Sequence, residues 1–531
     1  MLLAAFVLFA LVACTRGAPV YDVEERSIAQ LQTDLTSGAV TSEGLVEAYL
    51  ARIAAIDDTG PTLNSVIALN PRALEQARAL DAERAAGRVR GPLHGIPVLL
   101  KDNIESIENA TTAGSLALAY NNTARDAPLV ARLRQAGAII LGKTNLSEWA
   151  NIRSAASTSG WSAVGGLTRN PYALDRNPCG SSSGSGAAAA ASLAAVTIGT
   201  ETDGSIVCPS AINGLVGIKP TVGLVSRTYV VPISHTQDTP GPMGRTVADV
   251  AAVLTVIAGV DPADAATAQA DRRRQDYSAA LDANSLQGKR IGVLRFMAGF
   301  HRDTDQRFTE ALEHLRAAGA ELVEIEAPPT LGVIDADELT ILLAELKSDL
   351  NAYLAATPPS VATRTLADVI AFNETTPAET ILFGQDLFER AQATDGIGDP
   401  AYIAARARAP RRAAETLERL MRDNRVDALV APTLGPAWVT DIVNGDHFVG
   451  GGSSSLPAVA GYPHVTVPMG LAGGLPVGLS FIGEAWSEAK LLSFAYAYEQ
   501  RAHARTPPRY ARHLEEDEPF SAALRPASAP R

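Results

Sequence analysis

The chain has 531 residues, of which 47% are hydrophobic and 19% charged, and its formal net charge is -13 at pH 7. These values are typical of a soluble enzyme with a large core. Nucleic-acid binding requires clustered positive charge, and the lysines and arginines here form no long cluster, so we expect none. The three cysteines are too few for a disulfide framework. Cysteines and histidines show no metal-ligand spacing, so we expect no metal site.

The N-terminus begins with an apolar segment, Leu2–Ala13, which is too short to span a membrane but fits the hydrophobic part of a secretory signal. Its end, Leu11-Val12-Ala13-Cys14, resembles a bacterial lipoprotein signal, although no basic residue precedes it. We predict a signal peptide within residues 1–18 and export, with a periplasmic location or lipid attachment to the cell envelope through Cys14. An ordinary cleaved signal with an incidental cysteine is the alternative.

Helices followed by a buried strand are predicted in the first part of the mature chain. Apolar residues at helical spacing from Ser27 to Asp57, interrupted at Ser37-Gly38, predict two amphipathic helices. Asn70 as N-cap and Pro71 as first residue predict a third helix, over residues 71–86. Residues 91–104 predict a turn and then a buried strand.

Helices and strands alternate in the next segment, up to Ile206. The pattern predicts helices over residues 129–136, 145–153 and 187–193 and strands over residues 138–141 and 196–199. Alternation of this kind indicates an α/β fold with a largely buried sheet.

The second half of the chain adds strands and a helical insertion. Strands are predicted over residues 290–294, 428–430, 464–467 and 477–481, the first two in the centre of the sheet, and a helix over residues 488–502. We expect one domain over residues 25–510, with a mostly helical insertion at about 300–424 that covers one side of the sheet, and a loosely ordered tail over 514–531.

Acyl transfer from an amide needs a base, and Lys101 is the candidate. It ends an unbroken apolar run, Ile96–Leu100. Burial would lower the pKa of its amine and leave it neutral at working pH. A lysine that reaches the surface, or one that pairs with Asp102, is the alternative interpretation.

Two serines in glycine-rich runs are candidates for the nucleophile and its neighbour. Ser205 follows Gly204, and a glycine there lets backbone N–H groups turn toward a substrate oxygen; an ordinary turn is the alternative. Ser181 lies in the run Cys179–Gly186, just before an alanine-rich helix, and a helix cap is the alternative. The glycines around Ser181 could also hold a strained backbone, such as a cis bond.

Together these segments resemble the amidase signature family of serine hydrolases over about residues 27–504. The spacing of twenty-four residues between Ser181 and Ser205 equals the spacing of the family's two catalytic serines. The resemblance is carried by the serine runs and by Leu99-Leu100-Lys101-Asp102-Asn103, Gly199–Pro209, Gly217-Ile218-Lys219-Pro220-Thr221, Gln237–Met243 and Ala460–Gly470.

The resemblance implies a large mixed, mostly parallel, twisted sheet flanked by helices, and an amidase without a cofactor. Ser205 would be the nucleophile, Ser181 would relay the proton from a cis bond to Gly180, and Lys101 would be the base. Backbone N–H groups from Thr202, Asp203 and Gly204 through Ser205 would stabilise the oxyanion.

Two departures from the family pattern, Asp203 in place of a glycine and Ser183 in the first serine run, resemble the bacterial peptide amidase branch. That branch removes C-terminal amides of peptides with release of ammonia. We therefore expect a small-molecule or peptide amide as the substrate. We expect the protein to be a monomer or a homodimer. Small aliphatic or aromatic amides, or a non-catalytic amidotransferase-like subunit, are the alternatives. The match also brings Cys179 near Cys208; two buried thiols are favoured over a disulfide.

Two other motifs point to different chemistry, and both lack the expected context. Residues 137–144 match the nucleotide P-loop pattern, but Ala-Ile-Ile-Leu between the glycines predicts a buried strand and not a phosphate cradle. Residues 180–184 match the GxSxG elbow with Ser182 as nucleophile, but no clear strand precedes them.

Overall fold

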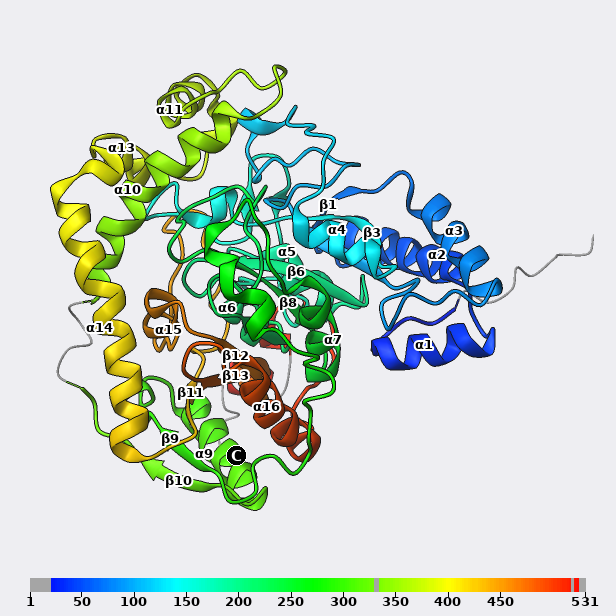
Figure 1. Ribbon diagram of the computed structural model, residues 1–531, viewed down its shortest axis with the longest axis vertical. Coiled ribbons are helices and arrows are strands. Elements are labelled where there is room, and N and C mark those ends of the chain that lie inside the picture. The colour runs from blue at the N-terminus through cyan, green and yellow to red at the C-terminus, as the bar shows by residue number, and fades with distance from the viewer. Residues whose placement is uncertain (1–20, 329–333, 517–519, 525–531) are drawn as a thin grey trace, which may run out of the picture.

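The computed structural model describes residues 21–328, 334–516 and 520–524. The predicted signal within residues 1–18, with Cys14, lies outside these residues. Figure 1 shows a broad sheet with helices packed on it, and with α10 and α14 along the side of the molecule away from α1–α3.

Within the described residues, eleven strands form one mixed sheet. Parallel pairing joins β3, β2 and β6 at one end and β11, β9 and β10 at the other, and the remaining neighbours are antiparallel. In sheet order the strands are β1 (Val66–Leu69), β3 (Ile139–Thr144), β2 (Pro97–Lys101), β6 (Val196–Glu201), β8 (Thr239–Gly244), β7 (Val216–Lys219), β12 (His464–Ala472), β13 (Leu475–Ile482), β11 (Ala428–Pro432), β9 (Arg290–Val293) and β10 (Glu321–Glu324). The predicted α/β fold with one large mixed sheet is confirmed.

A separate hairpin pairs β4 (Trp161–Ser162) with β5 (Gly166–Leu167). The helices are α1 (Ile28–Ser37), α2 (Ser42–Arg52), α3 (Ala73–Ala85), α4 (Pro128–Gln135), α5 (Ser183–Ala190), α6 (Val207–Ile212), α7 (Val247–Ile257), α8 (Ala270–Arg273), α9 (Arg302–Ala317), α10 (Ile334–Ala355), α11 (Leu366–Thr375), α12 (Pro377–Thr380), α13 (Asp386–Gln392), α14 (Pro400–Asn424), α15 (Ser455–Ala460), α16 (Glu488–Ala502) and α17 (Phe520–Ala523).

Two helices, α5 and α6, follow the catalytic serine candidates Ser181 and Ser205 and pack on the sheet. The residues of α5 are small, which lets this helix lie close to the strands. Every residue of α5 is buried, and the helix contacts β6, β8, β2 and β3. A Cβ atom on Gly184 would lie 2.4 Å from the carbonyl oxygen of Ser65 and 2.5 Å from that of Asn145, so only glycine fits there. α6 packs against α5 and against β7, β12 and β13.

Two predicted helices need correction. The helix predicted from Pro71 begins at Ala73, because Asn70 turns inward: its side-chain NH2 donates to the carbonyl of Ile140, at 2.6 Å. The helix predicted over residues 145–153 is a short 3₁₀ segment, Glu148–Asn151, whose Trp149 has a φ of 50°. Side chains of residues 145–153 make hydrogen bonds and an ion pair with other segments, among them Asn145 with Gly166 and Glu148 with Ala163. These tertiary contacts override the helical pattern.

The strands β9 and β11 lie toward one edge of the sheet and not in its centre as predicted, with β10 outermost. The insertion is mostly helical, as predicted. Its helix α9 packs on β12, β11 and β13, and α10 packs on α14. The second half of α10 packs with Ala113 of the loop after β2 and with Trp149 of the segment after β3, so the insertion forms one wall above the sheet.

Candidate active site

Three segments that are distant in sequence meet above the centre of the sheet: the end of β2, the loop before α5 and the turn before α6. Lys101 is the last residue of β2 and is fully buried. Its Nζ lies 2.8 Å from Ser181 Oγ, 2.9 Å from Thr200 Oγ1 and 3.2 Å from the Thr200 carbonyl. The structure thus brings the predicted base into contact with the predicted relay.

Burial lowers the pKa of Lys101 to about 7, and the negative charges of Asp238 and Glu201 act in the opposite direction. Lys101 therefore loses its proton near neutral pH. The alternative pairing with Asp102 is wrong, because the Asp102 carboxylate pairs with Lys143 at 3.2 Å. Lys143 belongs to the P-loop-like stretch and is fully buried in β3, as expected for a strand and not for a phosphate cradle.

The peptide bond between Gly180 and Ser181 is cis, as the family resemblance implies. The Ser181 carbonyl accepts a hydrogen bond from the Ser147 N–H at 3.0 Å. A Cβ atom on Gly180 would lie 2.1 Å from Ser147 Oγ, so the close approach of the two segments requires glycine. Because α5 starts only at Ser183, Ser181 does not cap this helix.

Ser205 and Gly180 line the same cavity, of about 390 Å³, and 8% of the surface of Ser205 is exposed. Its carbonyl accepts a hydrogen bond from the N–H of Ser182 at 3.2 Å, which ties the two serine segments together. Ser182 is an unsuitable nucleophile: it is fully buried, and its hydroxyl donates to the carbonyl of Thr200 at 3.1 Å.

The turn from Thr202 to Ser205 also lines the cavity. Gly204 has a φ of +78°, a conformation that favours glycine. Among residues 21–328, 334–516 and 520–524, the N–H groups of Asp203, Gly204 and Ser205 find no acceptor. Free donors next to a serine that lines a cavity can bind the oxygen of a substrate carbonyl.

Two buried carboxylates hold this turn from either side. Glu201 accepts hydrogen bonds from the N–H groups of Ile206 and Val207, at 2.8 and 3.0 Å. Asp238 accepts one from Thr202 Oγ1, at 2.6 Å. Neither carboxylate is among the residues predicted from the sequence; their only signal is their position inside the Gly199–Pro209 and Gln237–Met243 motifs.

Cys179 and Cys208 form a disulfide, with their Cα atoms 6.1 Å apart. The expectation of two buried thiols is therefore wrong. The bond joins the segment two residues before Ser181 to the segment three residues after Ser205. Both cysteines line the cavity, so the disulfide forms part of its wall.

The rest of the cavity wall is mostly apolar. Ile152, Ile233, Leu342, Leu434 and Phe448 line it. Leu342 comes from α10, so the helical insertion shapes the site as the sequence predicts. A neighbouring cavity of about 450 Å³ shares Gly451, Gly452 and Ser455 with it and extends toward Phe296 and Ile334.

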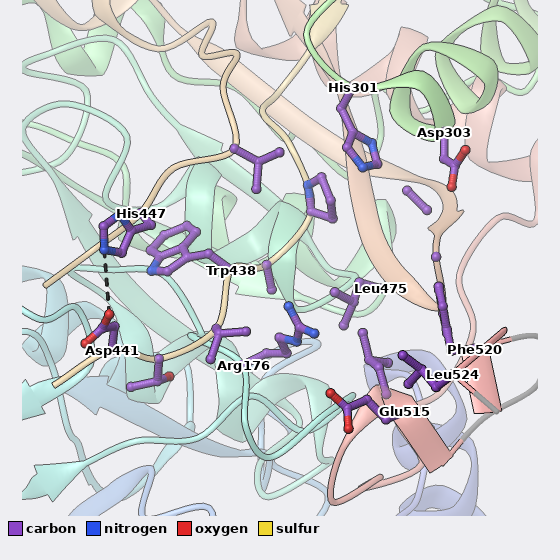
Figure 2. A pocket seen from close by; sticks show the side chains of 18 of the residues that line it. Arg176, His301, Asp303, Trp438, Asp441, His447, Leu475, Glu515, Phe520 and Leu524 are labelled. Atoms are coloured by element: carbon purple, nitrogen blue, oxygen red, sulfur yellow. Dashed lines mark ion pairs between the residues drawn. The ribbon is translucent and has the colours of Figure 1, made fainter. Parts of the chain in front are cut away.

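A larger cavity, of about 880 Å³, lies elsewhere, between the loop after β11 and the C-terminal segment. Figure 2 shows Trp438, Arg176 and Leu475 around it, with the ion pair of His447 and Asp441 at one side. None of the predicted site residues lines it.

One group among the described residues has the composition of a metal site: His235, Glu345 and Asp349. Its polar atoms bind one another and their neighbours instead. The His235 ring lies 2.8 Å from Asp349, and the Glu345 carboxylate accepts from Ser234 at 2.5 Å and from Tyr402 at 2.9 Å.

Comparison with known proteins identifies the family. The family model described as Amidase matches residues 44–492. The chain belongs to the amidase signature family. A protein of Arabidopsis thaliana named as a probable amidase is 41% identical over 93% of both chains. A putative amidase of Arthroderma benhamiae is 38% identical over 90% of this chain and 81% of its own.

Among solved structures, the native peptide amidase of Stenotrophomonas maltophilia superposes with a TM-score of 0.87. It is 54% identical and covers 92% of this chain and 99% of its own. Family membership, this likeness and the geometry of the site together show an enzyme that hydrolyses amides.

Proposed function

We propose that this amidase hydrolyses the C-terminal amide of peptides and releases ammonia, with Ser205 as nucleophile, Ser181 as relay and Lys101 as base. The observation that carries the mechanism is the contact between Lys101 Nζ and Ser181 Oγ, at 2.8 Å. Ser205 lines the adjacent cavity. The likeness to a peptide amidase supports the substrate class.

In the first step Ser205 Oγ attacks the amide carbon, and its proton passes to Ser181 Oγ while the Ser181 proton passes to neutral Lys101. The carbonyl oxygen becomes an oxyanion, which the free N–H groups of residues 203–205 stabilise. The C–N bond then breaks. The Lys101 ammonium returns a proton through Ser181 to the nitrogen, which leaves as ammonia.

Water completes the reaction by the same route. It attacks the acyl-enzyme on Ser205 and gives its proton through Ser181 to Lys101, and the proton returns to Ser205 Oγ as the acid leaves. Because a buried lysine is neutral near pH 7, this cycle needs no histidine.

The cavity suits a peptide on the acyl side of the scissile bond. Its wall offers apolar contacts from Leu434 and Phe448 and small residues near Ser205, and the neighbouring cavity gives room for further residues of a chain. The leaving group of a primary amide is ammonia, so the leaving-group side of the site needs little space.

Ammonia release tests the proposal. A peptide amide, the same peptide ending in glutamine with a free carboxylate, and simple aliphatic and aromatic amides are compared at equal concentration. We expect kcat/KM to be highest for the peptide amide, with conversion to the acid seen by mass spectrometry. Equal or greater activity on small amides would contradict the substrate class, and no ammonia from any amide would favour a non-catalytic subunit.

We propose in addition that the enzyme is exported. The apolar Leu2–Ala13 segment supports this, and so does the Cys179–Cys208 disulfide, because such bonds persist in oxidising compartments. Among the described residues, none of the helices combines the length and apolar character needed to cross a bilayer. Membrane attachment through a lipidated Cys14 is part of this proposal, and mass spectrometry of the mature N-terminus tests it.

A further inference from the structure

We infer that Asp238 is a positioning residue: its carboxylate joins Thr202, at the start of the oxyanion turn, to the Ile233–Ser234 backbone. The inference rests on the proposed mechanism. It adds a residue outside the triad, contributed by the loop before β8.

The geometry shows how Asp238 holds two walls of the site at once. Its Oδ1 accepts the hydrogen bond from Thr202 Oγ1, at 2.6 Å, at the start of the oxyanion turn. Its Oδ2 accepts the N–H groups of Ile233 and Ser234, at 2.8 and 2.9 Å. Ile233 lines the catalytic cavity, so one carboxylate joins the oxyanion turn to the opposite wall.

The charge of the same carboxylate also acts on Lys101. Asp238 and Glu201 are the two negatively charged groups that raise the pKa of Lys101, against the effect of burial. Lys101 contacts no carboxylate directly: its partners are the hydroxyls of Ser181 and Thr200 and one carbonyl. Burial is therefore the main cause of its low pKa, and these two anions offset part of that effect without direct contact.

The charge of Asp238 is itself maintained by its surroundings. Burial raises the pKa of Asp238 to about 6, while its hydrogen bonds and the Arg227 guanidinium favour the anion. Arg227 pairs with Asp264 at 2.6 Å, and His235 beside it pairs with Asp349 at 2.8 Å. Near pH 8 Asp238 is thus mostly ionised while Lys101 is mostly neutral, which is the state that the reaction needs.

Two substitutions separate the charge from the hydrogen bond. Asp238→Asn is isosteric: its Oδ1 can accept from the Ile233 and Ser234 N–H groups, and its NH2 can donate to Thr202 Oγ1, so the charge alone is lost. Thr202→Val removes the hydroxyl that contacts Asp238 and keeps both the charge and the backbone N–H.

The readout is the pH profile of kcat/KM from about pH 5 to about pH 9, with Tm as a check of folding. We expect Asp238→Asn to move the midpoint of the acid limb to lower pH by about 0.5–1 unit, because loss of an anion destabilises the Lys101 ammonium. We expect Thr202→Val to lower kcat about tenfold, because the oxyanion donors lose their alignment. The midpoint should move less than in Asp238→Asn, because the carboxyl group of Asp238 remains.

An unchanged midpoint in Asp238→Asn, or an equal shift in Thr202→Val, would overturn the electrostatic role. An unchanged kcat in Thr202→Val would overturn the positioning role. If Asp238→Asn does not fold, Asp238→Glu keeps the charge and changes the geometry; it should keep the midpoint and lower kcat, and a shifted midpoint would count against the inference. The proposed function fails separately, if the parent enzyme shows no acid limb or no amidase activity.

Discussion

Lys101 Nζ lies 2.8 Å from Ser181 Oγ, although 80 residues separate the two in the chain. Among the described residues, Lys101 has no carboxylate within ion-pair distance. A buried amine without a counter-ion loses its proton readily, so the contact is one between a base and a hydroxyl and not a structural ion pair. The lysine, the serines and the disulfide beside them can each be tested by substitution.

Lys101→Met should lower kcat about a thousandfold or more, because it removes the base and the source of the leaving-group proton. It should not unfold the protein. The pKa of Lys101 is lower in the folded state than its ordinary value of 10.5. The unfolded chain therefore binds more protons between about pH 7 and 10, and stability rises with pH in that window.

Burying the charged Lys101 amine costs free energy of folding, and this cost is largest at and below pH 7. A methionine at position 101 has no such cost. The three polar contacts of Lys101 are lost in exchange, each contributing about 1 kcal/mol. We expect a Tm at pH 7 at least as high as that of the parent and a gain that shrinks toward pH 10, both measurable by calorimetry. A clear loss of Tm at pH 7 would mean that Lys101 is retained for stability.

The activity of the parent enzyme should rise with pH through an acid limb centred near pH 7. The reason is that burial lowers the pKa of Lys101 to about 7, and only the neutral amine can accept a proton. The measurement is kcat/KM for a peptide amide against pH. Activity that stays flat from pH 5 to pH 8 would exclude Lys101 as the base.

Ser205→Ala should abolish hydrolysis, with a fall of about 10⁴-fold or more, because no nucleophile remains. Ser182→Ala is the matched control. Its hydroxyl only bridges to Thr200 inside the core, so this variant should lose a few-fold at most and about 1 kcal/mol of stability. Ammonia release by both purified variants checks the pair; near-complete inactivity of Ser182→Ala with retained folding would favour the GxSxG elbow.

Reduction of the Cys179–Cys208 disulfide should destabilise the enzyme. The bond closes a loop across a sequence separation of 29 residues, which corresponds to about 3.6 kcal/mol in the chain-entropy view. Activity should fall as well, because the bond holds the two serine segments together. Gel mobility with and without reductant shows the bond, and Tm of the Cys179→Ser and Cys208→Ser double variant measures its effect. An unchanged Tm would mean that packing alone fixes these segments.

Much of the site could be predicted from the sequence, because its chemistry lies in short runs of unusual composition. Lys101 ends an apolar run, and Ser181 and Ser205 each lie among glycines, which made all three candidates. Their roles were implied only by the resemblance to the amidase signature family. The Cys179–Cys208 bond was missed because spacing alone cannot tell two buried thiols from a disulfide. Asp238 was missed because a lone carboxylate within a family motif carries no local sign of what it contacts.

Sequence by itself determined most of the helices and strands and the candidate site residues, because hydrophobic periodicity and glycine content are patterns over a few residues. The position of β9 and β11 near the sheet edge, and the loss of the helix around Trp149, were decided only by tertiary structure, because strand order and loop contacts join residues far apart in the chain. The same holds for the neutral Lys101: an apolar run predicts a buried amine, but only the packed fold shows which carboxylates face it.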